Sequence, residues 1–148
     1  MSNFDVVVLG GGTGGYVAAV RGAQLGLKVA LVEREKVGGT CLHRGCIPSK
    51  AYLRSAELLH QFGRSKEFGI TAEGVSFDFG AVFARKEKIV GTLHKGVQGL
   101  LKKNGVTVIT GQGALVPPSI FSPGGLVSVM TPEGQQELLE PEKIILAT

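Results

Sequence analysis

The chain has 148 residues, of which 43% are hydrophobic, enough to bury the core of one globular domain. Sixteen basic and twelve acidic residues give a net charge of +4 without a basic stripe, which argues against nucleic-acid binding. Because no apolar run reaches membrane-spanning length and no targeting segment precedes the first apolar strand, we expect a cytoplasmic protein without a membrane partner.

The first elements predict a β-α-β unit. Residues 4–9 are apolar and β-branched, as in a buried parallel strand. A helix is expected over about 14–25, and a second strand over 28–32 ends at Glu33. This order of elements is typical of dinucleotide-binding domains.

The turn between the first strand and the helix has the GxGxxG spacing at Gly10, Gly12 and Gly15. These glycines permit a tight turn, the approach of a pyrophosphate and close packing of helix on strand. Glu33 lies roughly 20 residues further on, where its carboxylate can accept hydrogen bonds from ribose hydroxyls and repel a 2′-phosphate. The pattern favours FAD or NAD over NADP; the alternative is a glycine-rich turn without a ligand.

Both cysteines lie close together, since Cys41 and Cys46 are separated by four residues just before a helix start predicted at Pro48. So short a loop makes a poor structural brace, which favours a reversible redox couple. A helix N-terminus beside Cys46 would favour the thiolate over the thiol. The alternatives are two buried apolar cysteines, or half of a zinc site. The histidines available to complete such a site are His43, His60 and His94.

Two helices are expected next, one over 48–62 and a longer one that Asp78 caps and that ends near 104. The longer helix carries an apolar stripe that we expect to pack in the core. The stripe consists of Val82, Ile89, Leu93, Val97 and Leu100. His60 and His94 are expected to be ordinary helix residues.

The last part of the chain predicts a strand over 106–110, an antiparallel meander across the sheet, and a final buried strand over 143–148. The meander strands are expected over 114–116, 126–130 and 136–139, with turns at 117–118, 123–125 and 132–134. The predicted fold class is therefore α/β, a Rossmann-like doubly wound parallel sheet with a small antiparallel β meander.

The run from Gly38 to Lys50 resembles the active-site signature of the pyridine nucleotide-disulfide oxidoreductases, a family of flavoproteins. Its ending, Cys46-Ile47-Pro48-Ser49-Lys50, is most similar to the dihydrolipoamide dehydrogenase branch, and mercuric reductases are the nearest alternative. The resemblance implies that the first β-α-β unit binds FAD and that Cys41 and Cys46 form the catalytic disulfide. Cys41 would exchange with the substrate, and Cys46 would lie against the flavin. The residues that match the family's cofactor contacts are Gly10, Gly12, Gly15, Glu33, Gly39, Thr40, Cys41, Lys50, Gly113 and Thr148.

The resemblance covers essentially the whole chain. It implies that residues 1–148 are the N-terminal part of an FAD-binding domain, followed in the parent protein by NAD-binding and dimerisation domains. The parent would be a homodimer that uses FAD and NAD to oxidise dihydrolipoamide, the lipoyl group of a 2-oxoacid dehydrogenase or glycine cleavage complex. No metal is expected.

Two other functions stay open. The parent could be another flavin disulfide reductase, such as a mercuric reductase, or the chain alone could be a non-catalytic nucleotide-binding module. Thr13 and Gly22 depart from the family pattern, but neither change removes a phosphate donor. For the chain alone we expect weak FAD retention and no turnover.

Overall fold

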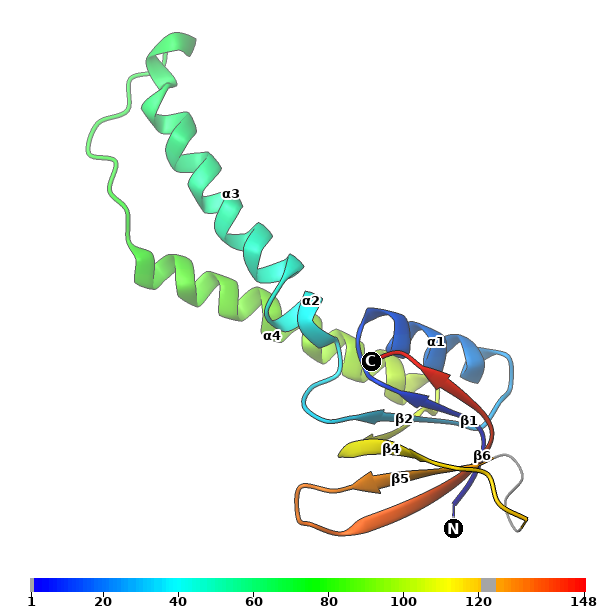
Figure 1. Ribbon diagram of the computed structural model, residues 1–148. Helices are drawn as coiled ribbons and strands as arrows, with labels where there is room; N and C mark the ends of the chain where they lie inside the picture. The colour runs from blue at the N-terminus through cyan, green and yellow to red at the C-terminus, as the bar shows by residue number, and fades with distance from the viewer. Residues whose placement is uncertain (1, 121–124) are drawn as a thin grey trace. The chain divides into compact units, whose positions relative to one another are not determined.

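The computed structural model describes residues 2–120 and 125–148 (Figure 1). Pro123 and Gly124, which belong to a predicted turn, lie outside the described residues. The chain forms two compact units: the second runs from Thr40 to Leu93, and the first holds the residues on either side of it. Within the described ranges, no helix combines the length and the apolar character that crossing a membrane requires.

The first unit is built on a six-stranded sheet with the strand order β3-β2-β1-β6-β5-β4. Four of its strands are β1 (Ser2–Leu9), β2 (Val29–Glu33), β3 (Thr107–Thr110) and β6 (Gln136–Leu146). The pairs β1–β2, β2–β3 and β1–β6 are all parallel. This arrangement confirms the predicted α/β class with a Rossmann-like parallel sheet.

One face of the parallel strands is covered by α1 (Thr13–Gln24) and by the last turns of α4 (Phe79–Lys103) (Figure 1). Alternate residues of β1 and β2 point to this face, as the period of two in a strand requires. The buried cluster on this face contains Val6, Val8, Ala19, Val20, Val29, Leu31, Val37, Leu101 and Val106. The helix layer therefore fixes the turn that joins β1 to α1.

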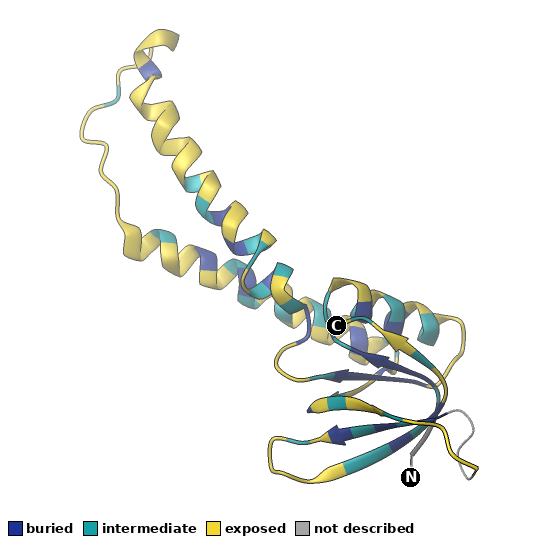
Figure 2. Ribbon diagram, in the orientation of Figure 1, coloured by how far each residue is buried: buried dark blue, intermediate teal, exposed yellow. Residues whose placement is uncertain are grey.

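The opposite face is covered by the meander of β4 (Gln112–Val116), β5 (Leu126–Met130) and the first half of β6. The second buried cluster contains Phe4, Val7, Leu9, Ala30, Val32, Val127, Val129 and Leu139. Figure 2 shows these strands dark where the two layers meet. The predicted antiparallel meander across the sheet is confirmed.

The prediction of two separate strands over 136–139 and 143–148 is wrong, because β6 is continuous from Gln136 to Leu146. Its pairing with β5 ends at Leu139, whereas its pairing with β1 continues to Leu146. Pro141 lies in the part with a strand on one side only, where a missing backbone N–H is tolerated.

The second unit contains α3 (Cys46–Gly63), the short 3-10 helix η1 (Ser65–Phe68) and residues 79–93 of α4. Asp78 caps α4 as predicted, since its Oδ1 accepts a hydrogen bond from the Ala81 N–H at 3.1 Å. The short helix α2 (Gly39–His43) was not predicted, and α3 begins two residues earlier than the Pro48 signal indicated.

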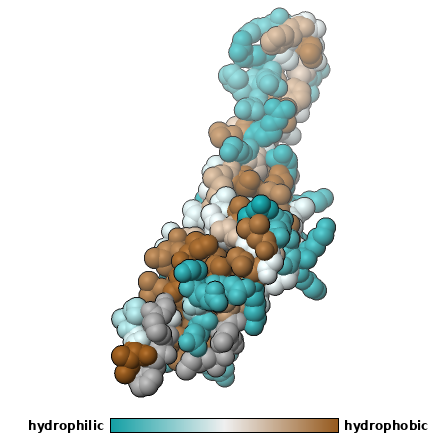
Figure 3. Space-filling view, turned by 90° about the vertical axis from the view of Figure 1, so that its right-hand side faces the viewer, coloured by the Kyte–Doolittle hydropathy of each residue, from teal (hydrophilic) through white to brown (hydrophobic). Residues whose placement is uncertain are grey.

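The stripe predicted on α4 is only partly buried. Leu93 and Leu100 are 43% and 41% exposed, whereas Lys86, Val90 and Leu101 are buried. The buried line runs beside the predicted stripe and includes a lysine, whose aliphatic stem can pack like an apolar side chain. Figure 3 shows, on one face of the molecule, apolar surface left open between hydrophilic side chains.

Candidate functional site

The glycine turn after β1 is held against the end of β6. Gly10 has a φ of +101°, and its N–H donates to the Val32 carbonyl at 2.9 Å. A Cβ on Gly10 would collide with the Ala147 carbonyl oxygen and would lie 3.0 Å from the Thr148 nitrogen. Only glycine combines this backbone conformation with such a close approach, so the two strand ends meet at this turn.

Gly12 and Gly15 differ in how much space surrounds the position of the missing Cβ atom. A Cβ on Gly15 would collide with the Gly10 carbonyl oxygen, so the helix can lie close to the strand only with glycine there. Gly12 is the N-cap of α1, carries no capping side chain, and has nothing within 4 Å of the place where its Cβ would be. The first N–H groups of α1 therefore border a space open to an anion.

The Glu33 carboxylate holds the turn from the neighbouring strand. Its Oε2 accepts a hydrogen bond from the Gly11 N–H at 2.7 Å, and its Oε1 accepts one from the Glu35 N–H at 2.8 Å. Each carboxylate oxygen has further acceptor capacity for a hydroxyl group. The Glu33 carboxylate therefore stabilises the turn through two backbone hydrogen bonds, and it can still accept further hydrogen bonds from a ligand at the end of β2.

Replacing Glu33 by alanine is expected to lower the free energy of unfolding by about 1–3 kcal/mol, because the Gly11 and Glu35 N–H groups lose their acceptor. Glu33→Gln, which keeps one acceptor oxygen, should cost less. Urea denaturation of both variants measures the difference. Equal stability of the wild type and Glu33→Ala would contradict this role.

The loop after β2 packs on the same turn. The Gly38 N–H donates to the Gly11 carbonyl at 2.7 Å. Gly39 has a φ of +62°, and a Cβ there would lie 2.6 Å from the Gly12 Cα. The structure thus gathers the predicted residues Gly10, Gly12, Gly15, Glu33, Gly39 and Thr148 at the ends of β1, β2 and β6.

Gly113 has a packing role. It lies in β4, where a Cβ would come within 2.6 Å of Leu9 Cδ2 and 3.2 Å of Val32 Cγ1. The absence of a side chain lets the meander approach the parallel strands. The close packing against Leu9 and Val32 is sufficient to explain why residue 113 is a glycine, without invoking a bound ligand.

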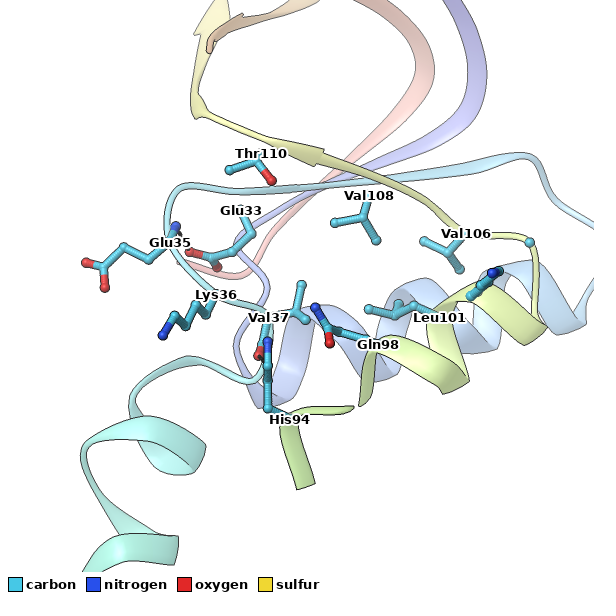
Figure 4. A pocket seen from close by; sticks show the side chains of 12 residues that line it. Glu33, Glu35, Lys36, Val37, His94, Gln98, Leu101, Val106, Val108 and Thr110 are labelled. Carbon is cyan, nitrogen blue, oxygen red and sulfur yellow. Dashed lines mark hydrogen bonds between the residues drawn. The ribbon is translucent and has the colours of Figure 1, made fainter. Parts of the chain in front are cut away.

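A pocket of about 490 Å³ begins at Glu33 and extends between β3 and α4 (Figure 4). Figure 4 shows Val106 and Val108 on one side, and Gln98, Leu101 and His94 on the other. The His94 Nδ1 lies 3.1 Å from the Val37 carbonyl oxygen. The lining of this pocket combines apolar side chains such as Val37, Leu101 and Val106 with polar and charged ones.

The two cysteines form a disulfide in the second unit, with their Cα atoms 4.7 Å apart. Cys41 lies in α2, and Cys46 is the first residue of α3. A Cβ on Gly45 would lie 3.1 Å from the Thr40 carbonyl oxygen and 3.5 Å from the Cys41 Cα, so glycine lets the two segments approach. Among the described residues, no group of three or more His, Cys, Asp or Glu side chains is placed to hold a metal ion.

Cys46 is exposed and Cys41 half-buried, so the disulfide is open to solvent in this chain. Thr40 and Lys50 are also exposed, on α2 and α3. Cys46 thus occupies the N-terminal position of an 18-residue helix, which favours a thiolate once the bond is reduced.

Several residues at these sites were not predicted. Gly11 and Gly38 act through backbone groups, and no side chain marks them. Val37, Gln98 and His94 line the pocket although His94 was predicted to be an ordinary helix residue. The adjacent glycines Gly38 and Gly39 were a sequence signal that could have indicated this tight loop, because glycine readily adopts positive φ and both residues have it.

Residues 4–148 match the model of the pyridine nucleotide-disulphide oxidoreductase family. The dihydrolipoyl dehydrogenase of Bacillus subtilis (strain 168) is 53% identical, over 99% of this chain and 31% of the relative. The mitochondrial dihydrolipoyl dehydrogenase of Pisum sativum is 44% identical, over 97% of this chain and 28% of the relative. The chain thus spans about a third of the length of these relatives.

Two solved structures share the fold. LpdA from Mycobacterium tuberculosis has a TM-score of 0.85 at 23% identity, covering all of this chain and 32% of that one. The flavoprotein disulfide reductase RclA from Escherichia coli, solved as a Cu(II) complex, has a TM-score of 0.75 at 28% identity, covering all of this chain and 29% of that one. Because the family model matches residues 4–148, which is nearly the whole chain, the chain belongs to the pyridine nucleotide-disulphide oxidoreductase family.

Proposed function

We propose that the protein is the flavin-binding, disulfide-bearing part of a dihydrolipoyl dehydrogenase. The observation that carries this proposal is the Cys41–Cys46 disulfide, whose second sulfur belongs to the first residue of a long helix. A disulfide in such a position is suited to reversible exchange. The similarity to several dihydrolipoyl dehydrogenases supports dihydrolipoamide as the substrate.

The glycine turn fits a dinucleotide. Gly12 leaves space that the chain itself does not fill, and the uncapped N-terminus of α1 offers N–H donors to a pyrophosphate. Glu33 would accept hydrogen bonds from a ribose. Thr40, Lys50 and Thr148 are the further residues that we propose on the cofactor side. FAD, when bound, would take two electrons from the reduced couple and pass them to NAD as hydride.

The chemistry of this chain's own residues is thiol–disulfide exchange. One thiolate of dihydrolipoamide attacks the Cys41 sulfur, the Cys41–Cys46 bond breaks, and Cys46 leaves as a thiolate that the α3 N-terminus stabilises. The second thiolate of the same dihydrolipoamide then attacks the lipoyl sulfur of the mixed disulfide, and Cys41 leaves as a thiolate. Dihydrolipoamide has then lost two electrons and become lipoamide, and the Cys41–Cys46 couple has gained the same two electrons as two thiols.

The exchange step can be tested without cofactors. Incubation with dihydrolipoamide should produce two new thiols per chain, measured by alkylation and mass determination. A monothiol at the same sulfhydryl concentration serves as the control and should react more slowly, because it cannot complete the exchange intramolecularly. Failure of dihydrolipoamide to reduce the protein, at concentrations that reduce a free peptide disulfide, would contradict the proposal.

The partners follow from the same substrate. We propose that the protein serves the lipoyl groups of a 2-oxoacid dehydrogenase or glycine cleavage complex as part of a homodimer. Reduction by NADPH with mercuric ion as the accepted substrate, and no reaction with dihydrolipoamide, would favour the mercuric reductase alternative.

Gly12→Ala is expected to weaken FAD binding by about tenfold or more, because the methyl group would fill the space that the pyrophosphate needs. Stability should change by less than about 1 kcal/mol, since the φ of −68° suits alanine and the new Cβ touches nothing in the chain. Fluorescence titration with FAD measures the affinity, and Gly14→Ala, also in open space, is the matched control. Unchanged affinity in Gly12→Ala would argue against a phosphate site.

A further inference from the structure

Lys86 of α4 is a buried charged residue that the proposed exchange chemistry does not use. It is only 9% exposed. Its Nζ lies 4.0 Å from the centre of the Phe83 ring and 5.8 Å from the centre of the Tyr52 ring, and it pairs with Glu87. The hydrogen bond to Glu87, opposed by desolvation and aided by Tyr52, holds the pKa of Lys86 above its ordinary value. Lys86 therefore stays charged in a fixed place between aromatic rings.

The burial of Lys86 depends on α3. Glu87 is its neighbour on α4 and has a side chain that is 57% exposed, so the ion pair by itself requires no burial. Tyr52, in contrast, belongs to α3 and brings its ring to the lysine from the facing helix. Lys86 thus links the two helices through its charge and its aliphatic stem.

These links are concentrated in the first turns of α3. Its buried residues are Pro48 and Ala51. The neighbouring cation of α4, Arg85, donates from Nη1 to the Ala51 carbonyl at 3.0 Å. Cys46 begins the same helix, and Ala51 follows it by about 8 Å along the helix axis. The part of α3 that carries the redox couple is therefore the part that two cations of α4 contact.

We infer that Lys86 is a positioning residue for the redox couple, which fixes the first turns of α3 and so the place of the Cys46 sulfur. Arg85 assists from the adjacent position. Arg85 brings positive charge toward the N-terminal half of α3, where it adds to the helix dipole in favouring a thiolate. Lys86 balances the charge of Glu87, so removing the lysine leaves an unbalanced negative charge beside α3 that disfavours the thiolate. This inference rests on the proposed role of the couple in thiol exchange.

The test measures the reactivity of Cys46 against pH. In a Cys41→Ser background, Cys46 is the single thiol of the chain, and its rate of alkylation by iodoacetamide reports the thiolate fraction. Lys86→Met keeps the length of the side chain and removes its charge. We expect the pH midpoint of alkylation to rise by about half a unit, which lowers the rate below the midpoint roughly threefold.

Two variants give the controls. Lys86→Arg should keep the wild-type profile, because it restores a cation over the rings. Lys88→Met removes an exposed charge from the same helix and should also leave the profile unchanged. If Lys86→Met fails to fold, Tyr52→Leu makes the same test from α3 and should shift the midpoint in the same direction.

The outcomes separate the two proposals. A lower melting temperature of Lys86→Met with an unchanged alkylation profile would make Lys86 a packing residue and overturn the inference. An equal shift in Lys88→Met would overturn it as well, because the effect would then be one of net charge. The Cys41→Ser protein without further changes tests the proposed function itself. If the pH midpoint for alkylation of its Cys46 equals that of free cysteine, the proposed function is contradicted.

Discussion

Cys46→Ser is expected to abolish the reduction of the protein by dihydrolipoamide. Without a disulfide between residues 41 and 46, the incoming thiolate has no S–S bond to break, so no exchange can begin. No thiols beyond Cys41 should appear on incubation with dihydrolipoamide, and the same substitution in the full-length parent should bring turnover below detection. The measurement is the alkylation assay described above, followed by a turnover assay with NAD.

Measuring the stability of Cys46→Ser shows whether the loss of reduction by dihydrolipoamide is due to misfolding. The disulfide closes a short loop, with a sequence separation of 5, so its removal should cost no more than about 2 kcal/mol in the chain-entropy model. Ser49→Ala, an exposed neighbour in the first turn of α3, is the matched control and should still be reduced by dihydrolipoamide like the wild type. In the flavin-loaded protein, Cys46→Ser should also lose the long-wavelength absorbance of the two-electron-reduced form, whereas Cys41→Ser leaves the Cys46 thiolate in place. Retention of that absorbance would refute the role given to Cys46.

Gly15→Ala is expected to destabilise the first unit by about 3 kcal/mol, near the upper end for added bulk in a packed site. The new Cβ would collide with the Gly10 carbonyl oxygen, and both groups belong to backbone that cannot rotate away. FAD binding should be lost in parallel, because α1 would have to move away from the end of β1. Urea denaturation gives the stability, and FAD titration gives the affinity.

The neighbouring glycine is the control for this substitution. Gly14 also lies in α1 but has nothing within 4 Å of its missing Cβ. Gly14→Ala should therefore stabilise the protein slightly, by about 0.5–1 kcal/mol, through its effect on chain entropy. Equal stability of the two variants would show that the helix can retreat from Gly10 at no cost.

The sequence predicted those features that depend on neighbours along the chain. The glycine turn was predicted from the spacing of Gly10, Gly12 and Gly15, because that spacing depends only on one strand, one turn and one helix that follow each other in the sequence. Cys41 and Cys46 lie near each other for the same local reason. The positions of the remaining strands along the chain, apart from the continuity of β6, were also recognisable from apolar runs between turn residues.

Features that depend on distant contacts were missed or misread. The sequence predicted separate strands over 136–139 and 143–148, but β6 is continuous through Pro141 because β1 pairs with it in that region. The α4 stripe was misplaced because burial there depends on what each side chain meets, and Lys86 meets aromatic rings. No pattern in the sequence shows that Gly39 will rest on Gly12.

The position of β6 has a consequence for how the protein is made. β1 stands between β2 and β6, and it pairs with residues up to Leu146, at the other end of the chain. During synthesis at about 5–20 residues per second, the nascent β1 edge must therefore wait several seconds for its second neighbour. Because Gly10 meets Ala147, the proposed pyrophosphate site is completed only after Ala147 has been synthesised. Contacts so remote in sequence slow folding and leave an apolar edge open meanwhile, so chaperones that shield such edges should raise the yield of the newly made protein.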